Sequence, residues 1–67
     1  MRAHLTVKGF DFTPEAAIAD LKQRCAVHIE KGWKDIYTVG VERGTNPYSD
    51  YPVHGYVATT VLENGDA

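Results

Sequence analysis

A single helical segment with clear start and stop signals governs which folds this sequence can adopt. Thr13 is a favourable N-cap, Pro14 is tolerated at the first helical position, and Glu15 puts a negative charge at the positive end of the helix dipole. Gly32 supplies the left-handed residue that commonly ends helices, so we predict a helix from Pro14 to Lys31. Helical spacing gathers one apolar stripe that we expect to face the core: Ile18, Leu21, Cys25 and Ile29, with Ala17 and His28 at its edge.

An alternating segment precedes this helix. Residues 3–8 place apolar side chains at every second position, which is the pattern of a β-strand with one buried face. After Gly9, the bulky residues Phe10 and Phe12 fall on the opposite parity. Because glycine is common at β-bulges, we expect a bulge or bend at Gly9 that turns both rings toward the helix.

Two segments after the helix are rich in β-branched and aromatic residues. They predict a second strand over residues 36–44 and a third over residues 53–62, paired antiparallel through the connecting loop. A helix with an apolar stripe is stable when it covers a sheet. The sequence therefore predicts one α+β domain over residues 1–67, with a βαββ order and one helix on one face of a three-stranded, antiparallel-type sheet.

The small size of the domain makes its core marginal. A chain of 67 residues buries only about 60% of the surface that its unfolded form exposes, and such domains usually need disulfides, a metal or self-association. Cys25 is the single cysteine, so an intramolecular disulfide is impossible, and this cysteine usage is typical of a reducing compartment. We expect a cytoplasmic protein, with neither a signal peptide nor a membrane span, that is stabilised by forming a homo-oligomer.

The charge pattern argues against nucleic acid as a partner. Seven basic and nine acidic residues give a formal charge of −2, and no run of like charge occurs. Proteins that bind nucleic acids generally carry a basic patch or stripe that neutralises phosphates. We therefore expect no nucleic-acid partner.

The strand patterns also predict which sheet face stays uncovered. In the third strand, Val53, Val57 and Val61 share one side, and the second strand has a matching apolar side. If the helix covers the valine side, the opposite face is exposed, and exposed apolar surface commonly marks an interface. We expect that face to contact a second subunit, or else a loop or terminus to cover it. The residues expected at the contact are Ile36, Tyr56, Ala58 and Leu62.

The loop over residues 45–52 gathers side chains that are suited to recognition. Two prolines restrict its backbone, so the loop is stiffer than its length suggests. Tyrosine offers a large contact surface and loses few rotamers on binding, and an aspartate can pair with a basic group. We expect Tyr48, Asp50 and Tyr51 to contact another protein. The alternative is that one tyrosine folds back to cap the end of the sheet while the prolines block edge-to-edge pairing.

No arrangement of residues predicts catalysis, a bound metal or a cofactor. Cys25 and His28 could face the same side of the helix, with His4 or His54 nearby, but a structural zinc site needs a second ligand pair that is missing here. On the apolar stripe, burial raises the pKa of the Cys25 thiol and hides it from substrate. The carboxylates are scattered, and the six glycines form no phosphate-binding loop. We expect neither an enzyme nor a metal site.

Trp33 directly follows the helix stop, where it could stack on a planar ligand or seal the helix end against the sheet, and we favour the second role. This position, the βαββ order, the Arg43–Gly44 pair and the run Val53-His54-x-Tyr56-x-x-Thr59 are similar to dodecins. Dodecins are small flavin-binding proteins that assemble as dodecamers. The resemblance implies that Trp33 stacks on an isoalloxazine ring and that the outer sheet face is an assembly surface. The chain departs from dodecins in its shorter helix, its longer second strand, its longer proline-rich loop, and Tyr56 in place of a glutamine.

A stiff aromatic loop and a spare apolar sheet face together favour a non-catalytic binding protein. We expect it to act as a small regulator or inhibitor that docks on a larger protein, a role that is frequent among bacterial and phage accessory proteins. The expected contacts are the 45–52 loop and the open sheet face. Dodecin-like flavin binding by a homo-oligomer is the alternative.

Overall fold

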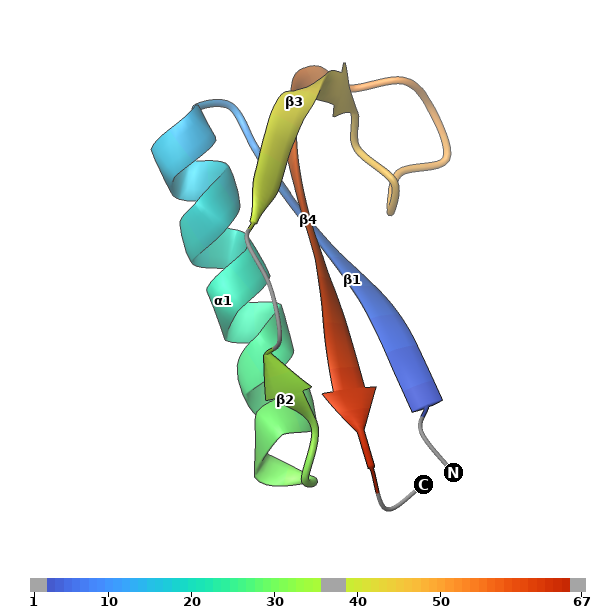
Figure 1. Cartoon of the computed structure of the whole chain (residues 1–67). Helices are drawn as coiled ribbons and strands as arrows, with labels where there is room; N and C mark the ends of the chain where they lie inside the picture. Colours follow the sequence, from blue (N-terminus) through green and yellow to red (C-terminus); the bar gives the residue numbers. More distant parts are fainter. Residues whose placement is uncertain (1–2, 36–38, 66–67) are drawn as a thin grey trace.

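The computed structural model describes residues 3–35 and 39–65. Within these ranges, one helix lies against one face of a four-stranded antiparallel sheet, so the fold is α+β with two layers (Figure 1). The elements in chain order are β1 (Ala3–Asp11), α1 (Pro14–Glu30), β2 (Lys34–Asp35), β3 (Gly40–Thr45) and β4 (His54–Asn64).

The helix begins and ends as the sequence predicts. Thr13 has an extended backbone, and its side chain accepts a hydrogen bond from an N–H of the first turn at 3.2 Å. At the other end, Lys31 is the C-cap, and its N–H donates to the His28 carbonyl at 2.9 Å. Gly32 has a φ of 101°, which is unfavourable for residues that carry a side chain. The predicted helix is confirmed, and its last helical residue is Glu30.

The central strand of the sheet is β4. β1 runs antiparallel along one edge, opposite residues 56–64 of β4. β2 and β3 both pair antiparallel with the other edge, β2 at residues 62–63 and β3 at residues 54–59. The predicted pairing of the second and third strands therefore occurs, between β3 and β4. The three-stranded sheet is not confirmed, because four strands are present among the described residues, and residues 36–38 of the predicted second strand lie outside those residues.

The helix covers the sheet face opposite to the one we expected. Ala58 and Leu62 are fully buried beneath α1, and Tyr56 is partly buried against the same core. The prediction that these three residues face away from the helix is therefore wrong. The reason is steric: on this face Gly9 lies opposite Ala58, and a Cβ at Gly9 would lie 2.5 Å from the backbone nitrogen of Leu21. The helix backbone approaches the sheet where its residues are smallest.

Gly9 is therefore a site of close packing and not a bulge. The register of β1 against β4 is continuous through this position, with Gly9 opposite Ala58 and Phe10 opposite Val57. This register puts Phe10 on the open sheet face, and the Phe12 side chain is 65% exposed. Their rings contact each other edge to face, with 5.6 Å between centroids. The prediction that both rings turn toward the helix is wrong.

The buried stripe of the helix is also rotated from the predicted one. Ala17, Leu21 and Cys25 are buried, whereas Ile29 is 48% exposed. The Cα radius of gyration is 12.4 Å, against about 11 Å expected for a compact domain of 67 residues. The domain is therefore more extended than a compact domain of this length, and its core is thin. Its buried apolar members among the described residues are Val7, Ala17, Leu21, Cys25, Ala58 and Leu62.

Candidate functional site

The outer edge of β1 carries a chain of polar contacts to the helix. The Phe10 N–H donates to Asp20 Oδ2 at 2.9 Å, and Arg24 Nε donates to the same oxygen at 2.9 Å. Partial burial by itself raises the pKa of Asp20, but the hydrogen bonds from Phe10 and Arg24 and the guanidinium charge outweigh it and lower the pKa overall. The pKa of Arg24 is raised, mainly by its hydrogen bond to Asp20. Asp20 is thus an ionised carboxylate that holds Arg24 beside β1.

Tyr48 reaches these contacts from the loop between β3 and β4. Its hydroxyl donates to the Lys8 carbonyl of β1 at 2.5 Å, and the Arg24 guanidinium carbon lies 4.1 Å from the centre of its ring. The second contact is a cation–π interaction. Of the two roles considered for the loop tyrosines, folding back against the sheet therefore describes Tyr48, which caps the side of β1. We call Lys8, Asp20, Arg24 and Tyr48 the Tyr48 cluster.

Short-range hydrogen bonds shape the loop itself. The Asn46 N–H donates to the Val53 carbonyl at 2.9 Å and closes the base of the loop. The Tyr48 N–H donates to the side-chain oxygen of Asn46 at 2.9 Å, which is an Asx turn that directs Tyr48 toward β1. The Ser49 N–H donates to the Asn46 carbonyl at 3.3 Å. The loop is therefore held at its base by its own backbone and at Tyr48 by β1 and α1.

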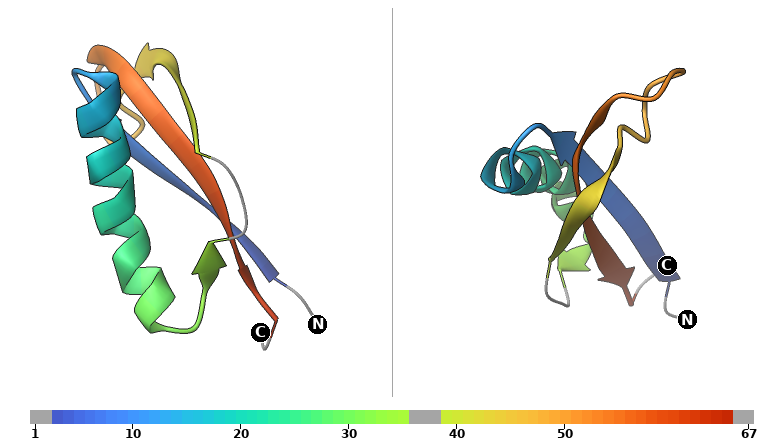
Figure 2. Two further views of the ribbon diagram at one scale, coloured as in Figure 1. Left: turned by 60° about the vertical axis from the view of Figure 1, so that its left-hand side comes forward. Right: turned by 90° about the horizontal axis from the view of Figure 1, so that it is seen from above.

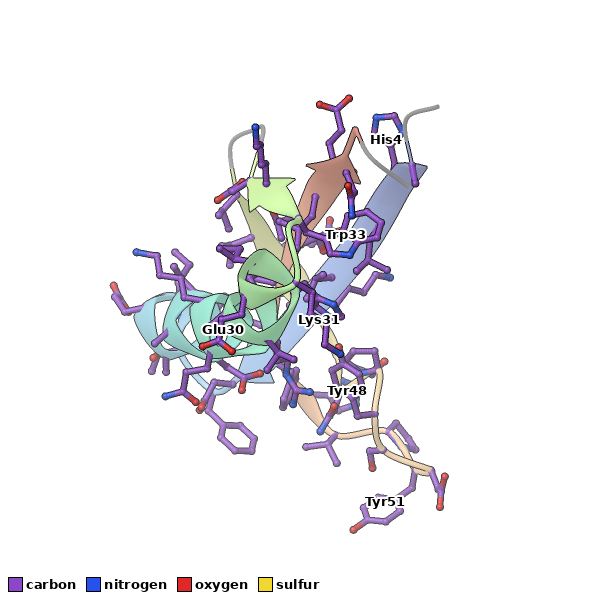
Figure 3. The ribbon with its side chains drawn as sticks, turned by 90° about the horizontal axis from the view of Figure 1, so that it is seen from below. His4, Glu30, Lys31, Trp33, Tyr48 and Tyr51 are labelled. Atoms are coloured by element: carbon purple, nitrogen blue, oxygen red, sulfur yellow. The ribbon has the colours of Figure 1, made fainter. Side chains whose placement is uncertain are left out.

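The tip of the loop projects from the rest of the fold. Figure 2 shows the loop between β3 and β4 extending away from the helix layer. Figure 3 shows Tyr48 near β1 and Tyr51 at the outer end of the loop. The Tyr51 side chain is 71% exposed and that of Tyr48 is 55% exposed, and Asp50 is exposed as well. Of the three residues predicted to bind a partner, the structure leaves Asp50 and Tyr51 at the tip and places Tyr48 at the support.

The residues predicted to contact a second subunit do not form one exposed surface. Ala58 and Leu62 have no exposed area, so they are unable to take part in a subunit contact, which corrects the prediction. Tyr56 is partly buried, and the Arg43 guanidinium carbon lies 5.9 Å from its ring centre. Ile36 lies outside the described residues. The sheet face away from the helix carries instead Phe10, Val57, Thr59 and Val61.

A largely apolar cavity of about 450 Å³ lies on the opposite flank of the helix, and Cys25, Asp35 and Thr60 are among its lining residues. Burial raises the pKa of the Cys25 thiol, and the negative charge of Asp35 raises it further. A thiol in this state is a poor nucleophile, so Cys25 is not activated for catalysis in this cavity. The cavity is also lined by Thr60, whose hydroxyl oxygen is buried without a hydrogen-bond partner.

Potential metal ligands do not converge in the described part of the chain. Within residues 3–35 and 39–65, no group of three His, Cys, Asp or Glu side chains lies close enough together to hold a metal ion. His4 and Glu63 form a pair of possible ligands whose Nε2 and Oε1 atoms are 3.7 Å apart. A pair alone is insufficient for a structural zinc site, which takes four ligands.

Trp33 lies where the chain turns from α1 to β2. Its side chain is partly buried against the core, and its backbone N–H donates to the His28 carbonyl at 3.1 Å. Figure 3 shows its ring between the helix end and the strands. Trp33 thus packs between the helix end and the sheet, which is the role that we favoured.

Three members of the Tyr48 cluster were not predicted as part of a site. Asp20 and Arg24 are four positions apart on a helix, and this spacing alone suggests an ion pair. Lys8 is forty positions from Tyr48, and its contribution is a backbone carbonyl, so no side-chain pattern could have linked the two.

No protein-family model, curated protein or solved structure matches the chain. Among the described residues, no helix combines the length and the apolar character needed to cross a membrane. The chemistry of the surface is therefore the basis for inferring function.

Proposed function

We propose that this protein is a non-catalytic binding module, which docks on a larger protein through the tip of its 45–52 loop as a small cytoplasmic regulator or inhibitor. The observation that supports this proposal is an exposed aromatic tip on a loop whose base is fixed. Tyr51 is 71% exposed beside the exposed Asp50, while Tyr48 is tied to β1 and to Arg24. An exposed tyrosine on a fixed loop is a common element of protein recognition surfaces.

The fixed base matters for affinity. Binding normally costs the conformational freedom of the loops that it orders, and a loop that is already held in place avoids much of this cost. Tyr51 can then contribute its contact area with few rotamers lost. Asp50 adds a negative charge beside the ring, which favours a partner surface with basic or hydrogen-bond donor groups.

The small area of the tip limits the affinity that we expect. Standard protein interfaces bury about 800 Å² on each partner, which is more than one loop tip can supply. Tyr48, which is 55% exposed, is the neighbouring residue that can extend the contact. We therefore expect Tyr51 to be the main contributor and Tyr48 to act both as support and as a secondary contact.

Site-specific photo-crosslinking tests the proposal. A photoreactive phenylalanine analogue replaces Tyr51 in the protein expressed in its source cells, and a matched control protein carries the analogue at Lys34, an exposed residue of β2. We expect a discrete protein adduct from position 51 that is absent from position 34 and that weakens when Asp50→Ala is added. The same crosslinked proteins from positions 51 and 34, or no adduct from position 51, would contradict the proposal.

Dodecin-like flavin binding by a homo-oligomer is the second candidate, and the exposed part of the partly buried Trp33 would have to carry it. Titration of the protein with FMN, followed by the fluorescence of its single tryptophan and of the flavin, tests this candidate. Mutual quenching together with a sedimentation coefficient well above that of a 7.4 kDa monomer would support flavin binding over protein docking. Unchanged fluorescence would exclude it.

A further inference from the structure

The outer edge of β1 has backbone groups that β4 does not use. Among the described strands, β1 pairs with β4 alone. The Lys8 carbonyl accepts a hydrogen bond from the Tyr48 hydroxyl, and the Phe10 N–H donates one to the Asp20 carboxylate. Neither of these side chains belongs to the sheet. Because successive residues of an edge strand alternate between facing the neighbouring strand and facing away, the N–H and carbonyl groups of Thr6 and His4 also point outward. His4, Thr6 and Lys8 are exposed.

A groove of about 370 Å³ runs beside this edge. The flank of α1 forms one wall, where Val27 is 53% exposed, and Tyr48 closes the end at Lys8 through its hydrogen bond to the carbonyl. The residues that line the groove are Leu5, Thr6, Val7, Arg24, Val27, His28 and Tyr48.

We propose that this groove binds an extended, acidic segment of another protein, which adds to the outer edge of β1 as a further strand between His4 and Lys8. Addition of a strand to an exposed edge uses main-chain hydrogen bonds for affinity and side-chain pockets for specificity. The Thr6 N–H and carbonyl supply the central hydrogen bonds. An apolar side chain of the bound segment covers Val27. The strand pairing stops at Lys8, because the Tyr48 hydroxyl is already hydrogen-bonded to the Lys8 carbonyl.

The charge of the groove selects the occupant. Arg24 lines it, Lys8 follows at its closed end, and no aspartate or glutamate is among the lining residues. Arg24 contacts Asp20 through Nε, and a guanidinium has four further N–H donors. An acidic side chain on the bound strand therefore finds donors at this end. A second copy of the chain fits poorly, since its own β1 segment between His4 and Lys8 carries no acidic residue to meet Arg24.

The groove is separate from the loop tip, so this proposal does not rest on the proposed function. Tyr51 is absent from the lining, and a change there leaves the groove intact. Thr6 is remote in sequence from the loop and contributes nothing to its hydrogen bonds. The variants Tyr51→Ala and Thr6→Pro thus separate the two surfaces.

Selection from a displayed library of random peptides of about nine residues, long enough to span the edge from His4 to Lys8, supplies the probe. We expect the enriched peptides to alternate apolar residues and to carry glutamate or aspartate. Thr6→Pro removes an outward N–H without touching the pairing with β4, and Arg43→Pro does the same on the outer edge of β3 as the matched control. Peptide affinity should fall about tenfold or more in Thr6→Pro and stay unchanged in Arg43→Pro.

Two further measurements keep the proposal testable if Thr6→Pro does not fold. The wild-type protein should bind the best peptide about tenfold more weakly after N-methylation of alternate peptide residues, which blocks strand pairing. Hydrogen exchange at the His4, Thr6 and Lys8 amides should slow when the peptide is bound. Equal affinity for Thr6→Pro or for the methylated peptide, enrichment of peptides without acids, or a β1-mediated dimer in sedimentation that excludes the peptide would overturn the proposal.

Discussion

The Tyr48 cluster predicts an energetic coupling between a loop residue and a helix residue that lie far apart in the sequence. Arg24→Ala and Tyr48→Ala each remove one side of the cation–π contact, whose guanidinium carbon and ring centre are 4.1 Å apart. Both side chains are partly exposed, so we expect a coupling free energy of about 0.5–1 kcal/mol. The Tyr48→Ala change also removes the hydrogen bond to Lys8, which adds about 0.5–1.5 kcal/mol to its own cost but not to the coupling.

The chain provides its own control for this double-mutant cycle. Arg43 and Tyr56 form a second cation–π pair, but at 5.9 Å, close to the limit of about 6 Å at which such contacts count. We therefore expect a smaller coupling for the Arg43→Ala and Tyr56→Ala cycle. The comparison of the two cycles tests whether the closer contact carries the larger coupling.

Urea denaturation followed by tryptophan fluorescence measures both cycles, because Trp33 is the single tryptophan and packs on the core. A domain of 67 residues has a total stability of about 3–10 kcal/mol, so every variant should remain folded enough to measure. A coupling between Arg24 and Tyr48 of no more than about 0.3 kcal/mol, the level at which independent sites add, would refute the contact as an energetic support of the loop.

Three further outcomes follow from the packing and the titrating groups. Gly9→Ala should destabilise the fold by about 1–3 kcal/mol or more in urea melts, since its Cβ would lie 2.5 Å from the helix backbone. Gly40→Ala is the control, because its Cβ would enter open space, and it should be neutral or slightly stabilising. Equal effects of the two changes would contradict the close approach of helix and sheet. Because folding lowers the pKa of Asp20, its ionised form stabilises the fold above an unfolded-state pKa of about 4, and this stabilisation is lost as the pH falls through the lower folded pKa. Wild type should thus exceed Asp20→Asn in stability at pH 7 and lose this margin as the pH falls through the lowered folded pKa; a margin that is independent of pH would count against an ionised Asp20. The Cys25 thiol, buried and with a raised pKa, should react with a disulfide reagent much more slowly in the native protein than in urea, and rapid native labelling would show that the thiol is accessible.

Local signals in the sequence were enough to predict the helix, β1 and β4 and part of β3, but they did not predict β2. The cap at Thr13, the proline at the first helical position and the glycine at position 32 each act within a few residues of their own position, so the helix ends could be read from the sequence. Alternation similarly identified the strand before the helix, and β-branched and aromatic content identified the strand over residues 53–62. The antiparallel pairing of β3 with β4 followed from the loop that connects them.

The sheet face that the helix covers could not be predicted in the same way. Valine patterns favoured the wrong side, because apolar content is a measure of burial but not of how closely a helix can approach. The deciding residue is Gly9, whose missing side chain admits the backbone of Leu21, and a glycine that follows an alternating run gives no sign of whether it marks a bulge or a crossing. Because the wrong face was chosen, Ala58 and Leu62 were predicted at an interface, whereas they lie in the core.

The candidate site was predicted in part for a related reason. Asp50 and Tyr51 are exposed in the loop that was predicted between two strands from its composition and its two prolines. The support under Tyr48 depends on Arg24 and a carbonyl of β1, which the fold brings together from three separate elements. Such contacts exist only once the register and the helix position are known.

The rigidity of the loop is the property on which the proposed binding tip depends, and backbone relaxation of the 15N-labelled protein measures it directly. We predict order parameters of about 0.85 for the backbone amides of the non-proline residues within 46–52 in the wild-type protein, equal to those of the strands, and a fall below about 0.6 in Tyr48→Ala, with the helix unchanged. Order parameters below about 0.6 in the wild-type loop, or no change on Tyr48→Ala, would contradict the role of Tyr48 in holding the tip for a partner.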